Sequence, residues 1–374
     1  MLRYKNKTFK IMLVGDPHIT ANEKSERDKS SFRDYIKFQR AALDNIKPDL
    51  VVLMGDNLSA DNADDFKKTL DKMVEPYIDA CVPFTAVYGN HDFEHKFNNR
   101  EEMDKIYKSY DLSYFLKSEY TNEYGDYVLP IYSGSTVSNL IFCMYSGNRC
   151  ENQEVSKYAY ILPEQIAWYE KTSKEISEKY GKKIPSILIQ HIPVCEEFEL
   201  CKKVSAIRRV ADGVPGLSLN KDDTYVLNCK TGVKGYMGEA PCTPDYNSGQ
   251  FASWKKMGNI IGAFFGHDHM NDFVGYVDDI MLAQCKTASF RVYGDGLKQG
   301  VRVVELLDGY DKIYNTYMLR YRDIFGTENE TIHGSELIPD RITKFFDKDE
   351  RRDLCSILLS VLQNPEKQQK SETS

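Results

Sequence analysis

The chain has 374 residues, of which 41% are hydrophobic, so it can form one large domain or two ordinary ones with a sizeable core. The formal net charge of -7 and the interspersed Lys and Arg residues leave no basic face for nucleic acid, which we therefore do not expect as a partner. No run of apolar residues reaches the about 20 that span a bilayer, so we expect no membrane contact. The N-terminal apolar run is too short for a signal peptide, and the odd number of cysteines fits no disulfide framework. We therefore expect a cytoplasmic protein.

Apolar runs of strand length alternate with longer amphipathic segments, which is the pattern of an α/β protein. Buried strands are predicted for residues 9–15, 49–55, 83–89, 185–190 and 260–266, and further strands for 140–145, 280–284, 301–306 and 312–319. Helices are predicted for residues 30–46, 63–80 and 162–181. The region between His191 and His267 is predicted to be a long loop that leads into a short helix, and such loops commonly select a substrate.

The chain changes character after residue 321. We predict one folded domain over residues 1–321 and a C-terminal extension over residues 322–374. The extension is predicted to contain an amphipathic helix followed by a disordered polar tail. One face of this helix carries Leu354, Ile357, Leu358, Val361 and Leu362. We expect the helix to dock on the folded domain, and a partner-binding helix is the alternative.

Each of the five best strands is followed by a cluster of side chains that can bind metal ions. In chain order the clusters contain Asp16 and His18, then Asp56, then Asn90, His91 and Asp92, then His191, and finally His267 and His269. Five of the seven histidines of the chain lie in these clusters. Because ligands of open α/β sheets bind outside the carboxyl ends of the strands, we expect the clusters to converge on one crevice.

The residue types in these clusters predict the kind of ion. Imidazoles, carboxylates and one side-chain amide, without a thiolate, favour manganese, iron, zinc or cobalt over calcium. Alternate residues of an extended segment point the same way, so Asp16 with His18, and His267 with His269, are each expected to face one side. The seven candidate ligands are too many for one tetrahedral ion; they are Asp16, His18, Asp56, Asn90, His191, His267 and His269. With Asp56 as a bridge they divide evenly between two ions about 3.5–4 Å apart.

The order of the blocks D-x-H, GD, GNHD, H and GHxH resembles that of the metallo-dependent phosphoesterases of the calcineurin-like superfamily, and the blocks span residues 16–269. The segment "GEAPCTPDYNSGQF", together with "GHDHMNDF", resembles the small phosphoesterases described as purple-acid-phosphatase-like. The resemblance implies the metallo-dependent phosphatase fold, in which two mixed β-sheets pack face to face and are flanked by helices as a four-layer αββα sandwich. Residues 1–321 would then form the catalytic domain.

The resemblance also implies a role for each clustered residue. One metal ion would be held by Asp16, His18, Asp56 and His269, and the other by Asp56, Asn90, His191 and His267. The implied reaction is hydrolysis of a phosphate ester by a metal-bridging hydroxide, with two ions of manganese, iron or zinc per chain. His91 is the implied general acid, and Asp92 is expected to orient it or to stabilise its charged form.

The expected partner is a small phosphorylated substrate, with a phosphomonoester preferred. One alternative is a phosphodiesterase that acts on cyclic nucleotides or other small diesters. An alternative of another class is a protein-binding scaffold that retains the fold; such a scaffold is expected to lose ligands or the acid, yet all seven ligands and His91 are present here. The sequence leaves the oligomeric state open, and we interpret His95 as a loop residue and Asp268 as a structural residue.

The residue at position 59 leads to a prediction about colour. Purple acid phosphatases owe their colour to a tyrosine ligand on ferric iron, placed three residues after the aspartate of the second block. This position is Ser59 here. We predict that the iron-loaded protein has no visible tyrosinate-to-iron absorption band, with the zinc-loaded protein as the spectroscopic baseline. A band in the iron-loaded sample would mean that a tyrosine from one of the loops binds the ion.

Overall fold

The computed structural model describes residues 1–205 and 213–326, which belong to one compact unit, Met1–Ser335. The amphipathic helix and the tail predicted for the C-terminal extension lie outside the described residues. The division of the chain at residue 321 into a catalytic domain and an extension therefore stays a prediction.

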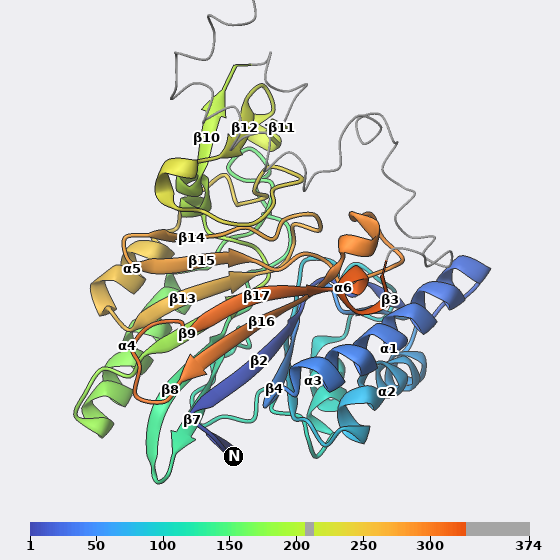
Figure 1. Cartoon of the computed structure of the whole chain (residues 1–374), viewed down its shortest axis with the longest axis horizontal. Coiled ribbons are helices and arrows are strands. Elements are labelled where there is room, and N and C mark those ends of the chain that lie inside the picture. The colour runs from blue at the N-terminus through green and yellow to red at the C-terminus, as the bar shows by residue number, and fades with distance from the viewer. Residues whose placement is uncertain (206–212, 327–374) are drawn as a thin grey trace, which may run out of the picture. The chain divides into compact units, whose positions relative to one another are not determined.

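A seven-stranded mixed sheet forms one layer of this unit, with the strand order β1-β7-β8-β9-β13-β15-β14 (Figure 1). Its strands are β1 (Leu2–Arg3), β7 (Tyr127–Ser133), β8 (Thr136–Cys143), β9 (Ser186–Gln190), β13 (Ile260–Phe265), β15 (Ile280–Gln284) and β14 (Val274–Val277). The central strands β8, β9, β13 and β15 are parallel, whereas β7 and β14 pair antiparallel with β8 and β15. The carboxyl ends of β9 and β13 therefore lie at the same edge of the sheet.

A five-stranded mixed sheet forms the second layer, with the order β17-β16-β2-β4-β6. Its strands are β17 (Asn315–Arg320), β16 (Gly300–Leu307), β2 (Thr8–Val14), β4 (Leu50–Met54) and β6 (Phe84–Val87). Strands β2, β4 and β6 are parallel, and β16 and β17 are antiparallel to their neighbours. All of these strands except β17 are largely buried, which explains why their apolar runs predicted them well.

Two small sheets complete the strands. One pairs β3 (Ile19–Thr20) with β5 (Leu58–Ser59), and the other has the order β10-β12-β11, with β10 (Cys201–Val204), β12 (Thr224–Leu227) and β11 (Val214–Pro215). The second sheet lies in the region predicted as a long loop. The sequence does not predict it because its strands are short and Lys202 and Lys203 of β10 are exposed, so the apolar pattern is missing.

The helices lie on the outer faces of the two sheets (Figure 1). They are α1 (Glu26–Ile46), α2 (Ala63–Asp79), α3 (Arg100–Lys108), α4 (Pro163–Tyr180), α5 (Gln250–Met257) and α6 (Tyr321–Phe325), with short 3₁₀ helices at Cys195–Leu200, Ser218–Asn220, Cys229–Thr231 and Gly296–Lys298. Helix α1 begins four residues before its prediction because its first turn is polar. There the start is marked by a capping box between Ser25 and Asp28, and not by apolar residues.

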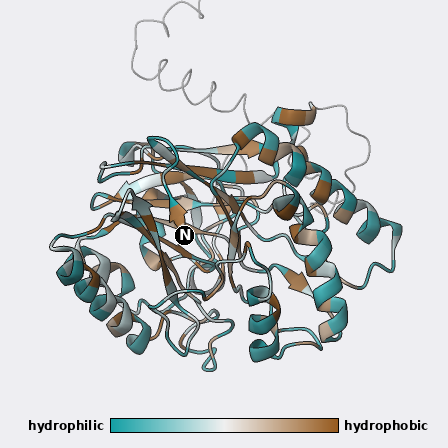
Figure 2. Cartoon of the chain, turned by 90° about the horizontal axis from the view of Figure 1, so that it is seen from below, coloured by the Kyte–Doolittle hydropathy of each residue, from teal (hydrophilic) through white to brown (hydrophobic). Residues whose placement is uncertain are grey.

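Alternation along the strands separates two hydrophobic cores. In β9, Ile187 and Ile189 belong to the core that both sheets share with α1 and α2. Leu188 points to the other face and belongs to the core formed with Tyr169 of α4 and Trp254 of α5. Figure 2 shows the hydrophobic strands between more hydrophilic helices. This arrangement is the predicted four-layer αββα sandwich of two mixed sheets, which is confirmed.

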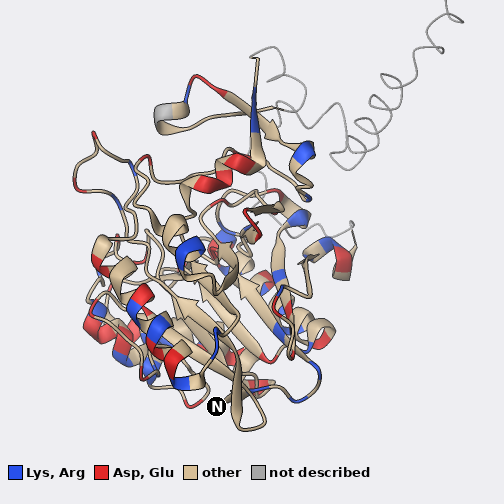
Figure 3. Ribbon diagram, turned by 90° about the vertical axis from the view of Figure 1, so that its left-hand side faces the viewer, with Lys and Arg blue, Asp and Glu red and all other residues tan. Residues whose placement is uncertain are grey.

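Charged residues are spread over the helices and loops and are rare on the strands. On the face that Figure 3 shows, Lys and Arg alternate with Asp and Glu along the helices and form no large patch of one sign. Within residues 1–205 and 213–326, no helix combines the length and the hydrophobicity that crossing a membrane requires.

A buried ionic cluster fixes the segment that follows β13. The carboxylate of Asp272 lies 3.1 Å from the Lys286 ammonium group and 2.9 Å from the Arg320 guanidinium group, and it accepts a hydrogen bond of 2.6 Å from the backbone amide of Tyr236. Burial opposes ionisation of Asp272, yet the nearby Lys286 and Arg320 hold its pKa well below the usual range. The cluster therefore ties the residues after His269 to the segment that follows β15 and to the end of β17.

This cluster generates a stability prediction. Asp272→Ala removes the carboxylate that contacts Lys286 and Arg320 and leaves the buried Lys286 paired with Asp295 alone, so it should lower the free energy of unfolding by about 3 kcal/mol at neutral pH. Because the pKa of Asp272 is depressed in the folded state, the loss relative to the natural protein should shrink as the pH falls below about 4.

Urea unfolding at several pH values measures this difference. Asp278→Ala is the matched control, because Asp278 pairs with Lys255 at the surface, where both side chains are about half exposed. Its cost should stay below about 1 kcal/mol. Equal costs for the two variants would contradict a dominant role of the buried cluster.

Candidate metal centre

The predicted clusters meet where the carboxyl ends of both sheets come together. The backbone amide of His267, which follows β13, donates to the carboxylate of Asp16, which follows β2, with N···O distances of 3.0 and 3.1 Å. The ring Nδ1 of His191, which follows β9, lies 2.9 Å from the backbone carbonyl of Met54 in β4. The crevice is thus built by two packed sheets, and not by the edge of a single open sheet.

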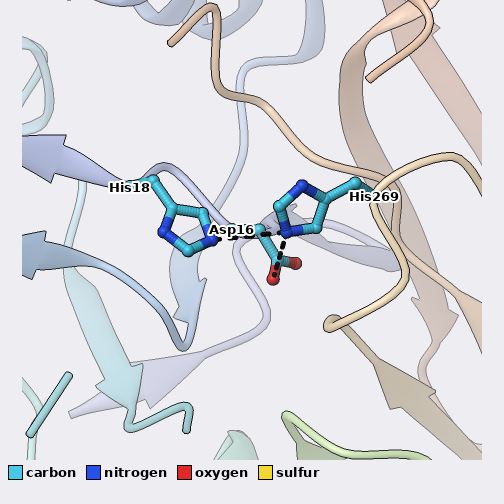
Figure 4. Close-up of side chains that lie close together, drawn as sticks. All are labelled: Asp16, His18 and His269. Atoms are coloured by element: carbon cyan, nitrogen blue, oxygen red, sulfur yellow. Dashed lines mark hydrogen bonds and ion pairs between the residues drawn. The ribbon is translucent and has the colours of Figure 1, made fainter. Parts of the chain in front are cut away.

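Two groups of candidate ligands lie in this crevice. In each group the ligand atoms lie within 4.8 Å of one another; the first contains Asp16, His18 and His269, and the second contains Asp56, His191 and His267. In the first group His269 Nε2 lies 3.3 Å from His18 Nε2 and 3.6 Å from Asp16 Oδ1 (Figure 4). His267 and His269 therefore face different groups, although the alternation argument placed them on one side.

Asp56 lies between the two groups. Its Oδ2 atom is 3.2 Å from His191 Nε2 in its own group and 3.5 Å from His18 Nε2 in the other. Asn90 joins the second group, because its Oδ1 atom lies 3.0 Å from His191 Nε2. All seven residues predicted as ligands are thus brought together, and Asp56 has the position that a bridging ligand needs.

The backbone is left-handed, and not extended, at four of the seven candidate ligands. The φ angles are 46° at Asp16, 45° at His18, 51° at Asp56 and 71° at His267. The expectation that extended segments present the pairs is therefore wrong: tight turns at the strand ends direct these side chains. A left-handed backbone at non-glycine residues costs about 1 kcal/mol or more at each position, and such strain concentrates at functional sites.

Glycines next to the ligands permit the close approach of the backbones. A β-carbon on Gly89 would lie 2.3 Å from Oδ1 and 2.5 Å from the backbone nitrogen of Asp56. Gly55 has a φ of 97° and its β-carbon would lie 2.6 Å from His191 Nδ1. Only glycine fits these two positions.

The donor set fits bound cations. The Nδ1 atom of His191 lies 2.9 Å from the backbone carbonyl of Met54, and that of His269 lies 3.0 Å from the backbone carbonyl of Tyr293. In both residues Nε2 is therefore the ring nitrogen that can bind an ion. The Nε2 atom of His267 is buried and has no hydrogen-bond partner in the described part of the chain. Burial lowers the pKa of His269 to about 4, which keeps its imidazole neutral, as a metal ligand must be.

His91 and Asp92 lie beside this centre and have different surroundings. The ring of His91 is partly exposed, with its centroid 5.6 Å from that of His18, and its backbone amide donates to Asp56 Oδ1 over 2.7 Å. Asp92 is buried and accepts hydrogen bonds from the backbone amides of Gly89, Asp56 and Asn57 at 2.7, 2.9 and 2.8 Å. Its carboxylate thus braces the loops that carry the ligands.

The expected contact between Asp92 and the His91 ring is replaced by another. The Nδ1 atom of His91 hydrogen-bonds to Oε2 of Glu94, which the sequence analysis did not select. The reason is that both oxygens of Asp92 are occupied by backbone donors. The spacing of three residues between His91 and Glu94 is the signal that could have suggested this pair, because a turn brings such side chains together.

Two tyrosines that the sequence did not place also flank the centre. The ring of Tyr293 stacks on His269 with a centroid distance of 4.1 Å, and Tyr158 meets His267 edge to face at 4.4 Å. The hydroxyl of Tyr293 donates to Glu239, so it is directed away from the ligand atoms. Asp268 accepts from the backbone of Cys242 and from Asn271, which agrees with its structural interpretation.

The chain is similar to several known proteins. The sequence model of the family described as calcineurin-like phosphoesterase matches residues 9–271. A probable inactive purple acid phosphatase, number 29, of Arabidopsis thaliana is 27% identical, covering 80% of this chain and 77% of the relative. Phosphatase DCR2 of Saccharomyces cerevisiae is 25% identical over 71% of this chain and 44% of its own length. A dimetal phosphatase from Danio rerio, known from its crystal structure, shows a TM-score of 0.48 and 12% identity, covering 84% of this chain and 100% of that chain.

The geometry predicts the metal content. Because Asp56 is shared between two groups of ligands, we expect about two ions per chain after reconstitution, measured by elemental analysis of the desalted protein. His269→Ala removes one ligand and should lower the content of the ion held with Asp16 and His18. His95→Ala is the matched control: His95 is exposed and belongs to neither group, so about two ions should remain. A natural protein that binds a single ion under all conditions would contradict the division into two groups.

Proposed function

The chain belongs to the calcineurin-like phosphoesterase family, and on that premise we propose that it hydrolyses phosphomonoesters at a two-metal centre with His91 as the general acid. Membership makes it a metal-dependent phosphoesterase; the type of ester and the residue roles are the proposal. The observation that carries it is the position of Asp56 between two groups of candidate ligands.

The proposed division of labour follows from the surroundings of each residue. When bound, the two ions activate the attacking water, bind the phosphoryl oxygens and leave a surplus of about two positive charges over the two aspartates, which suits a phosphate ester. Asp16, His18, Asp56 and His269 would hold one ion, and Asp56, Asn90, His191 and His267 would hold the other. Manganese, iron and zinc are the candidate ions, because all donors are nitrogen or oxygen atoms.

His91 is proposed to complete the reaction. It lies beside the ligands, but its ring belongs to neither group of candidate ligands. As the bond between phosphorus and the leaving oxygen breaks and the water oxygen bonds to phosphorus, His91 donates a proton to the leaving oxygen. The products are an alcohol and inorganic phosphate. Asp92 contributes by fixing the loops of Asp56 and Gly89 through its four backbone hydrogen bonds.

A screen of phosphate esters tests the reaction class. The protein is reconstituted separately with manganese, zinc and iron, and a monoester is compared with a bis-ester of the same leaving group. Faster hydrolysis of the monoester supports the proposal, whereas faster hydrolysis of the bis-ester or of cyclic nucleotides makes the chain a phosphodiesterase. Because some relatives are named inactive, no turnover of any ester with about two ions bound would favour the scaffold alternative. The complete set of ligands and His91 supports an active enzyme.

The acid role of His91 predicts a specific kinetic signature. If His91 protonates the leaving oxygen, His91→Ala should lower kcat by about 10²–10⁴-fold for alkyl phosphates, which leave poorly, and much less for an activated aryl phosphate. The metal content should remain at about two ions per chain. The measurement is kcat for a series of esters whose leaving groups differ in pKa, alongside elemental analysis.

His269→Ala is the contrasting variant in the same series. It should lower the metal content and reduce turnover of every ester to a similar extent, because an open coordination position weakens the hold on the ion. The same behaviour in His91→Ala, an equal loss for all leaving groups together with a missing ion, would falsify the acid assignment.

A further inference from the structure

We propose that Glu94 is a positioning residue for His91 and that Arg149 holds Glu94 in place. This inference rests on the proposed function of His91 as the general acid. It adds to the reaction two residues that the five sequence blocks do not contain.

The hydrogen bond between His91 Nδ1 and Glu94 Oε2 sets the direction of the ring. A turn supports it, because the backbone amide of Glu94 donates to the carbonyl oxygen of His91 over 3.2 Å. With Nδ1 engaged by Glu94, Nε2 is the nitrogen that remains for a substrate, and it has no hydrogen-bond partner within the described residues. The contact therefore selects which ring nitrogen faces the leaving oxygen.

His91 needs such a partner because, within the described residues, its ring makes no other hydrogen bond. Its backbone is held by the bond from its amide to Asp56 Oδ1, but the side chain is 39% exposed and has only the His18 ring as an aromatic neighbour there. The neighbouring Asp92 cannot serve, since its two oxygens already accept from four backbone amides. Proton transfer requires the acid within about 3 Å of the leaving oxygen, so a rotating ring would spend little time in the productive position.

Arg149 anchors the other oxygen of Glu94. Its Nε atom lies 3.3 Å from Glu94 Oε1. Arg149 also forms a backbone bridge with Tyr158, whose ring contacts His267 on the far side of the centre. The segment from Arg149 to Tyr158 thus connects the acid with a ligand of the second group. Because Arg149 is 56% exposed and its ion pair is screened by water, its contribution should be smaller than that of Glu94.

The test compares variants at position 94 across esters with different leaving groups. Glu94→Ala should lower kcat for an alkyl phosphate by about 10–100-fold, a part of the help that a general acid gives, and should leave an activated aryl phosphate nearly unchanged. Glu94→Gln keeps an oxygen that can accept from Nδ1 and should recover part of the loss. Arg149→Met should show the same pattern with a smaller effect. Metal content and thermal unfolding are measured for every variant.

Glu154→Ala is the matched control. Glu154 is an exposed carboxylate in the same segment as Arg149, and its side chain makes no contact with the candidate site residues in the described structure. Its kinetics should equal those of the natural protein for every ester. An effect as large as that of Glu94→Ala would mean that the loss of a negative charge, and not the contact with His91, changes the rate.

A double-variant cycle separates positioning from other roles. If Glu94 acts through His91, then Glu94→Ala should cause no further loss in a His91→Ala background. Full additivity, or an equal loss for alkyl and aryl esters, would overturn the positioning role of Glu94.

These outcomes also distinguish the two proposals. If His91→Ala itself shows no dependence on the leaving group, the proposed acid role fails and the positioning role fails with it. If His91→Ala shows the dependence and Glu94→Ala does not, only the inference about Glu94 fails.

Discussion

The burial of two carboxylates at one point, Asp16 and Asp56, is the constraint on which the rest of the structure depends. Both are almost completely buried where the two sheets meet, and an unpaired anion in such a place is very unfavourable. Burial would lower the pKa of His191, yet Asp56 and Asp16 raise it to about 10. The site therefore demands positive charge, which fits the binding of divalent ions.

This demand explains the unusual backbone around the centre. Side chains from both sheets can approach one point only if the chain turns sharply after each strand. The left-handed conformations at Asp16, His18 and Asp56 and the absence of a β-carbon at Gly89 meet this requirement. The buried carboxylate of Asp92 then fixes two of these turns through hydrogen bonds to their amides. Local strain is thus maintained by the packing of the surrounding sheets.

The proposed acid has a different environment from the ligands. The candidate ligands are held by buried contacts to backbone carbonyls and to one another, whereas His91 lies at the exposed rim and depends on side-chain contacts with Glu94. A rim position suits a group that must reach the leaving part of a substrate. It also means that a substitution of the His91 ring would leave the contacts among the candidate ligands in place.

The sequence by itself determined the strands that precede the candidate ligands, three of the long helices and the candidate ligands, because these depend on local patterns. Apolar runs such as residues 49–55 predicted buried strands, since a strand covered on both faces needs apolar side chains throughout, and the polar clusters after them identified all seven residues that meet in the crevice. The tertiary structure decided how these residues meet. It directed the ligand side chains through left-handed turns where the sequence analysis expected extended segments, and it gave Glu94, not Asp92, to the His91 ring. The physical reason is that side-chain direction and hydrogen-bond partners at the strand ends are set by the packing of one sheet on the other, which joins residues such as Asp16 and His267 that are 251 positions apart.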